Sequence, residues 1–160
     1  MNKNFTQKNI ILITRLTRDS AIKYSKHLLD NYELLDKISK EALSKISIIE
    51  YCKCFLFNKL KNQNDIGSDI RNWIQDFRIN LFDGMSEEDK IIHERFMNIR
   101  NTEWAHSDEN AFDIEWYIPM QGIEIPISRS TDYVLPKFDL SKIISFSELQ
   151  IRNLIDHYLE

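Results

Sequence analysis

Two side chains in this sequence can act together on a phosphodiester. Arg100 and His106 are separated by five residues. A guanidinium group binds phosphate through its planar fork of donors, and an imidazole with an ordinary pKa of about 6.5 transfers protons near neutral pH. This combination suits RNA cleavage without a metal ion: the 2'-hydroxyl attacks, histidine acts as base or acid, and arginine stabilises the charge that builds up on phosphorus. One arginine and one histidine are few catalytic groups for this reaction, so a symmetric dimer that brings two such pairs together would complete the site.

A predicted helix positions this pair. Ile92, Phe96 and Ile99 define its apolar stripe, and continuing the helix places Glu103 on the centre line of that stripe, with the arginine and the histidine on either side. Burying such groups without partners is costly. Three arrangements would satisfy them: a water-filled cleft, a closed ladder in which the three groups pair with one another, or a second subunit that completes the site.

The stretch 99–108, Ile-Arg-Asn-Thr-Glu-Trp-Ala-His-Ser-Asp, resembles the signature of the HEPN superfamily (higher eukaryotes and prokaryotes nucleotide-binding). That signature is an arginine followed by a polar residue, then a histidine after four to six intervening residues. The residues of this stretch are most similar to those of abortive-infection-like and uncharacterised bacterial members. The resemblance implies that Arg100 and His106 form the catalytic pair and that Asn101 is the polar residue that helps orient them.

The resemblance also implies a function. Many members of the superfamily are dimeric, metal-independent RNases of toxin–antitoxin, abortive-infection or other defence systems. We therefore expect an endoribonuclease with RNA as substrate, a second copy of the chain as partner, and an antitoxin protein as a further partner. In some toxins of this kind the antitoxin modifies a tyrosine two residues after the histidine, but this chain has Asp108 there, so that regulation is not implied.

A second hypothesis assigns the same cleft a binding role without catalysis. The chain would then be an RNA-binding, nucleotide-binding or protein-interaction module. The acidic residues around the motif, among them Glu103, Asp108 and Glu109, favour this alternative because they repel RNA unless basic groups face the same groove. A purely structural role, in which the ladder stabilises the end of the helix, is the third hypothesis.

Composition is that of a globular protein of a single domain spanning residues 1–160. The hydrophobic fraction is 42% and the charged fraction 29%, and three Gly and three Pro leave few breaks for long helices. The net charge of -4 is uneven: residues 1–62 carry +6 and the remainder -10, a division that can steer an anionic ligand to one face. The sequence shows neither a long apolar run nor a signal peptide, so we expect a cytoplasmic protein without a membrane partner.

Neither a metal nor a cofactor is expected. Cys52 and Cys54 lie two apart in a helical pattern, so their side chains point in roughly opposite directions and are predicted to be packing residues. The remaining histidines, His27, His93 and His157, do not have the spacing of a metal-binding pair.

Apolar periodicity predicts an all-α fold of about five helices, and the resemblance to the HEPN superfamily implies that they form an up-and-down bundle. The first two helices are expected at 5–32 and 33–60, the third ends at Asp83–Gly84, the fourth begins at a Ser86 cap, and a C-terminal helix follows a loop that extends to about Ser145. The first is expected to bury Ile13, Leu16, Tyr24 and Leu28. The second is expected to bury Leu35, Ile38, Ala42, Ile46, Ile49, Cys52, Leu56 and Leu60. The apolar stripe of the third consists of Ile70, Trp73, Ile74, Phe77 and Leu81.

A short β-hairpin is predicted as an insertion near 114–127. Two runs rich in Ile, Trp and Tyr flank a turn at Pro119-Met120-Gln121-Gly122, and Pro126 confines the second strand to an edge. We expect this hairpin to cover the cleft or to shape the dimer.

Overall fold

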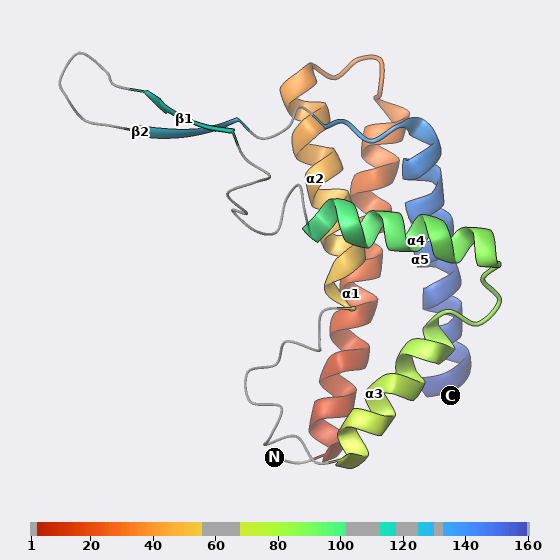
Figure 1. Ribbon diagram of the computed structural model, residues 1–160. Coiled ribbons are helices and arrows are strands. Elements are labelled where there is room, and N and C mark those ends of the chain that lie inside the picture. The colour runs from red at the N-terminus through yellow and green to blue at the C-terminus, as the bar shows by residue number, and fades with distance from the viewer. Residues whose placement is uncertain (1–2, 56–67, 102–112, 118–124, 130–132, 160) are drawn as a thin grey trace.

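The computed structural model describes residues 3–55, 68–101, 113–117, 125–129 and 133–159 (Figure 1). Within these residues the fold is an all-α helical bundle with one two-stranded sheet, as predicted. The helices are α1 (Lys3–Asp30), α2 (Lys37–Lys53), α3 (Ser68–Leu81), α4 (Glu87–Ile99) and α5 (Lys137–Tyr158), and the strands are β1 (Asp113–Tyr117) and β2 (Ile125–Arg129).

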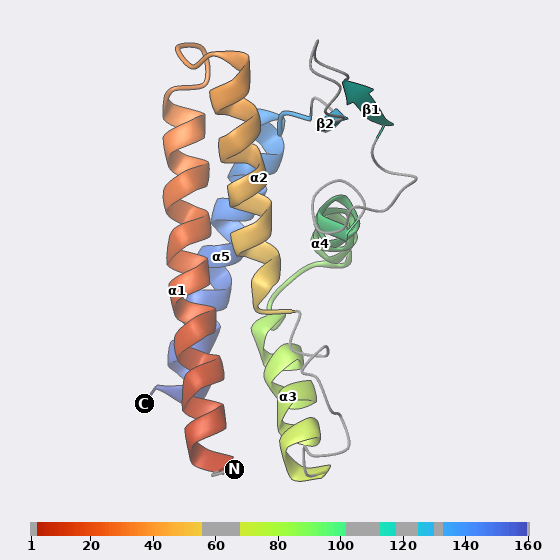
Figure 2. The same ribbon diagram turned by 90° about the vertical axis from the view of Figure 1, so that its left-hand side faces the viewer.

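Three helices form the bundle, and a fourth crosses it. α1 runs antiparallel to both α2 and α5, and these three lie side by side in both views (Figures 1 and 2). α3 packs along the lower half of the bundle against α5. α4 lies across the bundle, nearly at right angles to α2, and is seen almost end-on in Figure 2. α4 ends at Ile99, so the candidate motif begins where this crossing helix ends.

Local capping explains where α2 and α4 begin. The Asp36 carboxylate accepts a hydrogen bond of 2.9 Å from the backbone N–H of Ser39, and the Ser86 hydroxyl accepts one of 3.1 Å from the N–H of Asp89. Each side chain satisfies an N–H that has no partner within its helix. The predicted start of the fourth helix at Ser86 is confirmed, whereas the second helix begins at Lys37, four residues later than expected.

The buried faces of α1 and α2 agree with the prediction only in part, since Leu28 and Cys52 are fully buried as expected but other residues are not. Ile13 and Leu16 are exposed on α1, and Ile38 on α2 has 78% of its surface exposed. Small hydroxyl residues occupy much of the interior instead, because they let the helices approach closely and can bond the backbone, as Ser44 Oγ does in accepting from the N–H of Leu135 at 3.0 Å. The buried polar residues of α1 and α2 are Thr14, Thr17, Arg18, Ser25, Ser44 and Ser47.

The other predicted elements are present with changed ends. In α3, Ile74, Phe77 and Leu81 are buried as expected. The chain then turns at Gly84, whose φ of 77° lies in the left-handed region that favours glycine. α5 begins at Lys137, well before the predicted position, because Pro136 fixes a backbone angle that suits the start of a helix.

The predicted hairpin is an antiparallel pair of β1 and β2. Trp116 pairs with Pro126, and Ile114 pairs with Ser128. In this two-stranded sheet both strands are edges, which is where a proline is tolerated. Whether the hairpin covers a cleft or shapes a dimer stays a prediction.

Candidate functional site

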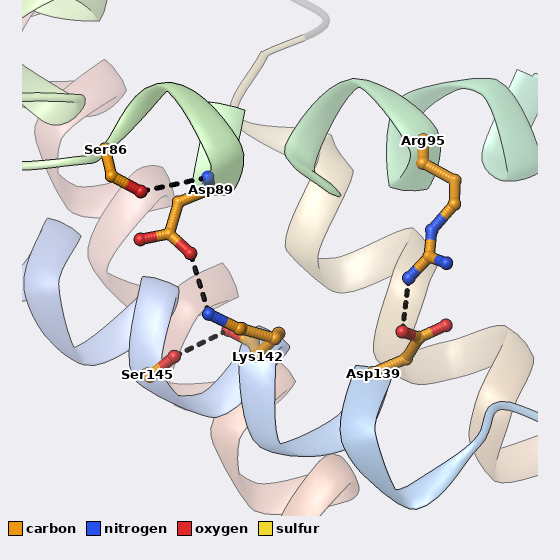
Figure 3. Close-up of polar contacts among 6 residues, drawn as sticks. All are labelled: Ser86, Asp89, Arg95, Asp139, Lys142 and Ser145. Atoms are coloured by element: carbon orange, nitrogen blue, oxygen red, sulfur yellow. Dashed lines mark hydrogen bonds and ion pairs between the residues drawn. The ribbon is translucent and has the colours of Figure 1, made fainter. Parts of the chain in front are cut away.

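Two ion pairs fix α4 to α5 (Figure 3). The Asp89 carboxylate lies 2.7 Å from Lys142 Nζ, and the Arg95 guanidinium pairs with Asp139. Asp139 is only 2% exposed, and burial raises the pKa of its carboxyl group, while the charge of Arg95 acts in the opposite direction. The two pairs hold the first and the third turn of α4, so the position of its C-terminal end is set by the bundle.

Arg100 and Asn101 follow directly at that end. Arg100 caps the helix with a helical backbone conformation, and its N–H donates to the carbonyls of Phe96 and Met97. Arg100 Nη1 donates a hydrogen bond of 2.9 Å to Asn101 Oδ1. Arg100 is half-buried and Asn101 is exposed. Within the part of the chain that the structure describes, no carboxylate forms an ion pair with Arg100, so its positive charge is shared only with a neutral amide.

The structure thus brings together two of the three predicted site residues. His106 lies outside the described residues, as do Glu103 and Asp108, so the choice between an open cleft and a closed ladder stays a prediction. The rest of α4 agrees with the expected stripe at Phe96, which is fully buried, and Ile92 and Ile99 pack partly buried against the core.

A buried cluster that the sequence reasoning missed lies beneath α4. Arg18 of α1 is completely buried, with its guanidinium carbon 4.6 Å from the centre of the Tyr51 ring and 4.9 Å from that of Phe55. Arg18 Nη2 also donates to the Cys54 sulfur. Two aromatic faces stabilise the cation. Its Nε and Nη1 atoms, however, have no hydrogen-bond partner among the described residues.

His93 of α4 joins this cluster. Its Nδ1 atom lies 2.8 Å from the Tyr51 hydroxyl, and its ring is packed edge-on against Phe55 and Phe82 at centroid distances of 4.6 and 4.7 Å. Burial, and then the charge of Arg18, lower the pKa of His93 to about 4. Burial raises the pKa of Tyr51. Both groups are therefore neutral at pH 7, and their hydrogen bond joins α2 to α4.

Both cysteines are buried and unpaired, in agreement with their predicted packing role. Burial raises the pKa of Cys52 to about 12 and also raises that of Cys54. These thiols therefore stay protonated and are not nucleophiles at neutral pH.

Three guanidinium groups surround the C-terminal end of α2. Arg18 contacts Cys54, Arg78 Nη2 donates to the Phe55 carbonyl at 2.7 Å, and the charge of Arg100 acts on the Cys52 thiol. The carbonyl end of a helix carries partial negative charge, which favours cations there. Arg18 and Arg78 are therefore favourably placed at this end of the helix.

Arg18 gives a stability prediction whose sign is unusual for a core residue. Arg18→Met is expected to raise the free energy of unfolding by about 1–4 kcal/mol, because a fully buried charge with unpaired donors is often less stable than an apolar side chain of similar size. Urea denaturation measures this. Arg15→Met on the same helix is the control, since the exposed Arg15–Asp19 pair is worth only about 0.3–0.5 kcal/mol. If Arg18→Met instead lowers the free energy of unfolding by more than about 1 kcal/mol, the contacts of Arg18 with the rings and the sulfur outweigh the cost of burying its charge.

The described segments contain no group of three or more His, Cys, Asp or Glu side chains that could hold a metal ion. None of their helices is long and apolar enough to cross a bilayer.

Comparison with known proteins adds no relative. The chain matches no family model, no curated protein and no solved structure.

Proposed function

We propose that this protein is a metal-independent endoribonuclease of the HEPN type that acts in the cytoplasm as a toxin or defence protein. Arg100 and His106 are the catalytic pair, and Asn101 orients the arginine. The observation that carries the proposal is the Arg100–Asn101 contact at the end of α4, in an all-helical bundle whose sequence continues to a histidine five residues after the arginine.

The contact supports a role in phosphate binding. The Asn101 amide oxygen engages one guanidinium nitrogen and adds no negative charge, so the cation remains available to an anion. A guanidinium group binds two phosphate oxygens at once and favours the charge that develops on phosphorus during 2'-hydroxyl attack. The imidazole of His106 takes the proton of the 2'-hydroxyl or gives one to the leaving 5'-oxygen. The products are a 2',3'-cyclic phosphate and a free 5'-hydroxyl.

A second copy of the chain would supply a second histidine, so that one imidazole acts as the base and the other as the acid. One imidazole cannot be base and acid in the same concerted step, whereas two histidines related by a two-fold axis can divide these roles. We therefore propose a homodimer in which two motifs face one cleft. An antitoxin protein is proposed as the partner that keeps this activity in check.

Cleavage of RNA in the presence of EDTA tests the proposal. The purified protein is expected to cut single-stranded RNA of mixed sequence and to leave 2',3'-cyclic phosphate ends, detected by mass spectrometry. The same sequence as DNA is expected to remain intact, because it lacks the attacking hydroxyl. An RNA that stays intact over a broad range of sequences, or products with 3'-hydroxyl ends, would contradict the mechanism.

The binding-module alternative gives a different pattern. RNA would then bind saturably without product, and Arg100→Ala would weaken that binding. Glu94 and Asp83, both exposed near α4, add to the acidic surroundings that favour this alternative. Measuring binding and cleavage on the same RNA separates the two functions.

A further inference from the structure

A cleft opens beside α4, at the corner where α3 meets it. Its volume is about 840 Å³, within the range of small-ligand sites. The side chains and turn that line it come from the end of α3, the connecting turn and the first half of α4. They are Ile79, Asn80, Phe82, Asp83, Gly84, Met85, Lys90, His93 and Glu94.

The buried part of this cleft contains a polar group. His93 is only 9% exposed, and its Nδ1 atom is occupied by Tyr51. Phe82 stacks on Phe55 with ring centroids 5.3 Å apart and contributes an aromatic surface next to the imidazole. A flat ring that enters the cleft would meet these apolar and aromatic contacts.

The charges at the rim select the kind of ring. Asp83 and Glu94 are acidic, and the single cation, Lys90, lies 2.6 Å from Glu87 and is partly neutralised. A phosphate group would be repelled here. Carboxylate and amide oxygens instead accept hydrogen bonds from exocyclic amino groups, as acidic side chains do from the N4 of cytosine and amide side chains from the N6 of adenine. The rim therefore favours a nucleobase that carries an amino group.

The cleft and Arg100 lie on the same side of α4. His93 and Arg100 are seven residues apart, which is two helical turns or about 10 Å along the axis. A nucleotide chain whose phosphate binds Arg100 can thus place a neighbouring base at His93. We propose that the cleft is a base-binding subsite that accepts cytosine or adenine and excludes uracil; this inference rests on the proposed action on RNA.

Free nucleosides test the subsite without requiring cleavage. Cytidine and uridine are matched probes, because they differ in the amino and carbonyl groups at position 4. In an NMR titration of the full chain, cytidine is expected to bind saturably and at least five-fold more tightly than uridine, with shifts confined to residues that line the cleft. Equal affinity for the two nucleosides, or binding of neither, would overturn the subsite.

Two exposed isoleucines supply a matched pair of variants. Ile79 lines the cleft and is 62% exposed, and Ile91 is 67% exposed but is not among the lining residues. Ile79→Trp is expected to fill the cleft and to weaken cytidine binding at least five-fold, whereas Ile91→Trp leaves it unchanged. Both variants should retain the wild-type circular dichroism spectrum. Cytidine affinity that survives Ile79→Trp would show that the nucleoside binds elsewhere.

Glu94 tests the selection of the amino group. Glu94→Gln replaces a carboxylate, which only accepts hydrogen bonds, with an amide, which accepts and donates them. The preference for cytidine over uridine is therefore expected to fall below two-fold. Glu88→Gln, an exposed position in the first turn of α4, should keep the wild-type preference. An unchanged preference in Glu94→Gln contradicts the role of the rim.

Failure of the subsite and failure of the nuclease give different results. Arg100→Ala should leave cytidine binding unchanged, because a nucleoside has no phosphate. If cytidine binds but RNA is never cleaved, the nuclease proposal fails and the subsite stands. If RNA is cleaved with no preference for C or A next to the scissile bond, and Ile79→Trp cleaves the same sites, the subsite fails and the nuclease stands.

Discussion

His106→Ala is expected to lower the rate of RNA cleavage by about 10²–10⁴-fold, the usual contribution of general acid–base catalysis. Its free energy of unfolding should stay within about 0.5 kcal/mol of the wild-type value, since a histidine in an open cleft contributes little to stability. The rate is measured with a fluorescently labelled RNA in EDTA, and the stability by urea denaturation. Both measurements on one variant separate catalysis from a structural role.

The exposed His27 of α1 provides the control. His27→Ala should cleave RNA at the wild-type rate. If His106→Ala instead destabilises the protein by about 1–3 kcal/mol, the histidine belongs to a closed ladder with Glu103 and Arg100, as expected when a buried polar network is broken. If His106→Ala cleaves as fast as the wild-type protein, the catalytic assignment is wrong.

Arg100 gives a second check on the same site. Arg100→Lys keeps the charge but loses the planar fork, so it should retain RNA binding better than cleavage. Arg100→Ala should lose both. An Arg100→Lys variant with wild-type cleavage would show that point charge alone is required and that the contact with Asn101 has no catalytic role.

Sequence features that act within a few residues, such as helix caps and apolar stripes, correctly predicted the start of α4 and the buried face of α3. Ser86 specifies the start of α4 by a side-chain bond to the N–H of Asp89, and the acidic residues of the first turn suit the positive end of the helix dipole, so no tertiary information is needed. The stripe through Ile74, Phe77 and Leu81 also predicted the buried face of α3. In both cases the physical cause is local, and the pattern is visible in a short window.

The buried faces of α1 and α2 could not be predicted in the same way. Hydropathy placed Ile13 and Leu16 inside, but both are exposed, and small hydroxyl residues share the interior of α1, α2 and α5 with the apolar core. Close helix packing depends on side-chain volume at facing positions, which one sequence does not reveal. Arg18 was also missed. It lies on the same buried face of α1 as Ala21, but hydropathy assigns a charged residue to the surface.

The assignment of the candidate site stays a prediction. Arg100 was identified from its spacing to His106 and Asn101 through the resemblance to the HEPN signature. The structure adds the hydrogen bond between these two chain neighbours, while His106 lies outside the described residues. His93 was considered only as a metal ligand and set aside, although it lies three residues before the buried Phe96 and so on the buried face of α4. Its partner Tyr51 is 42 residues away in sequence, and only the fold brings the two together.

Stability in acid is expected to depend strongly on His93. Its pKa is about 4 in the folded protein, below the ordinary value of 6.5, because the charged form is buried among aromatic rings next to Arg18. Between these two pH values the unfolded chain binds the proton and the folded protein does not. The stability from neutral His93 is therefore complete above pH 6.5 and decreases as the pH falls toward 4. The shift of 2.5 units corresponds to a loss of about 3 kcal/mol.

Urea denaturation at several pH values from 7.5 to 4 measures this loss. His93→Gln does not titrate and can still accept from Tyr51, so its free energy of unfolding should vary by less than about 1 kcal/mol between pH 7 and 5. His27→Gln, at an exposed position, should show the wild-type dependence. A wild-type protein that is equally stable at pH 7 and 5 would contradict the burial of a neutral His93.

Arg18 links this titration to the rest of the buried cluster. Its charge is the second cause of the low pKa of His93, so Arg18→Met should raise that pKa toward 6.5 and make the acid-induced loss of stability smaller. The same substitution is expected to stabilise the protein at pH 7, because it removes the unpaired cation. Both effects have one electrostatic origin. If Arg18→Met stabilises the protein without raising the pKa of His93, measured from its ring proton shifts in NMR, then burial alone sets the pKa and the cation acts only on the rings beneath it.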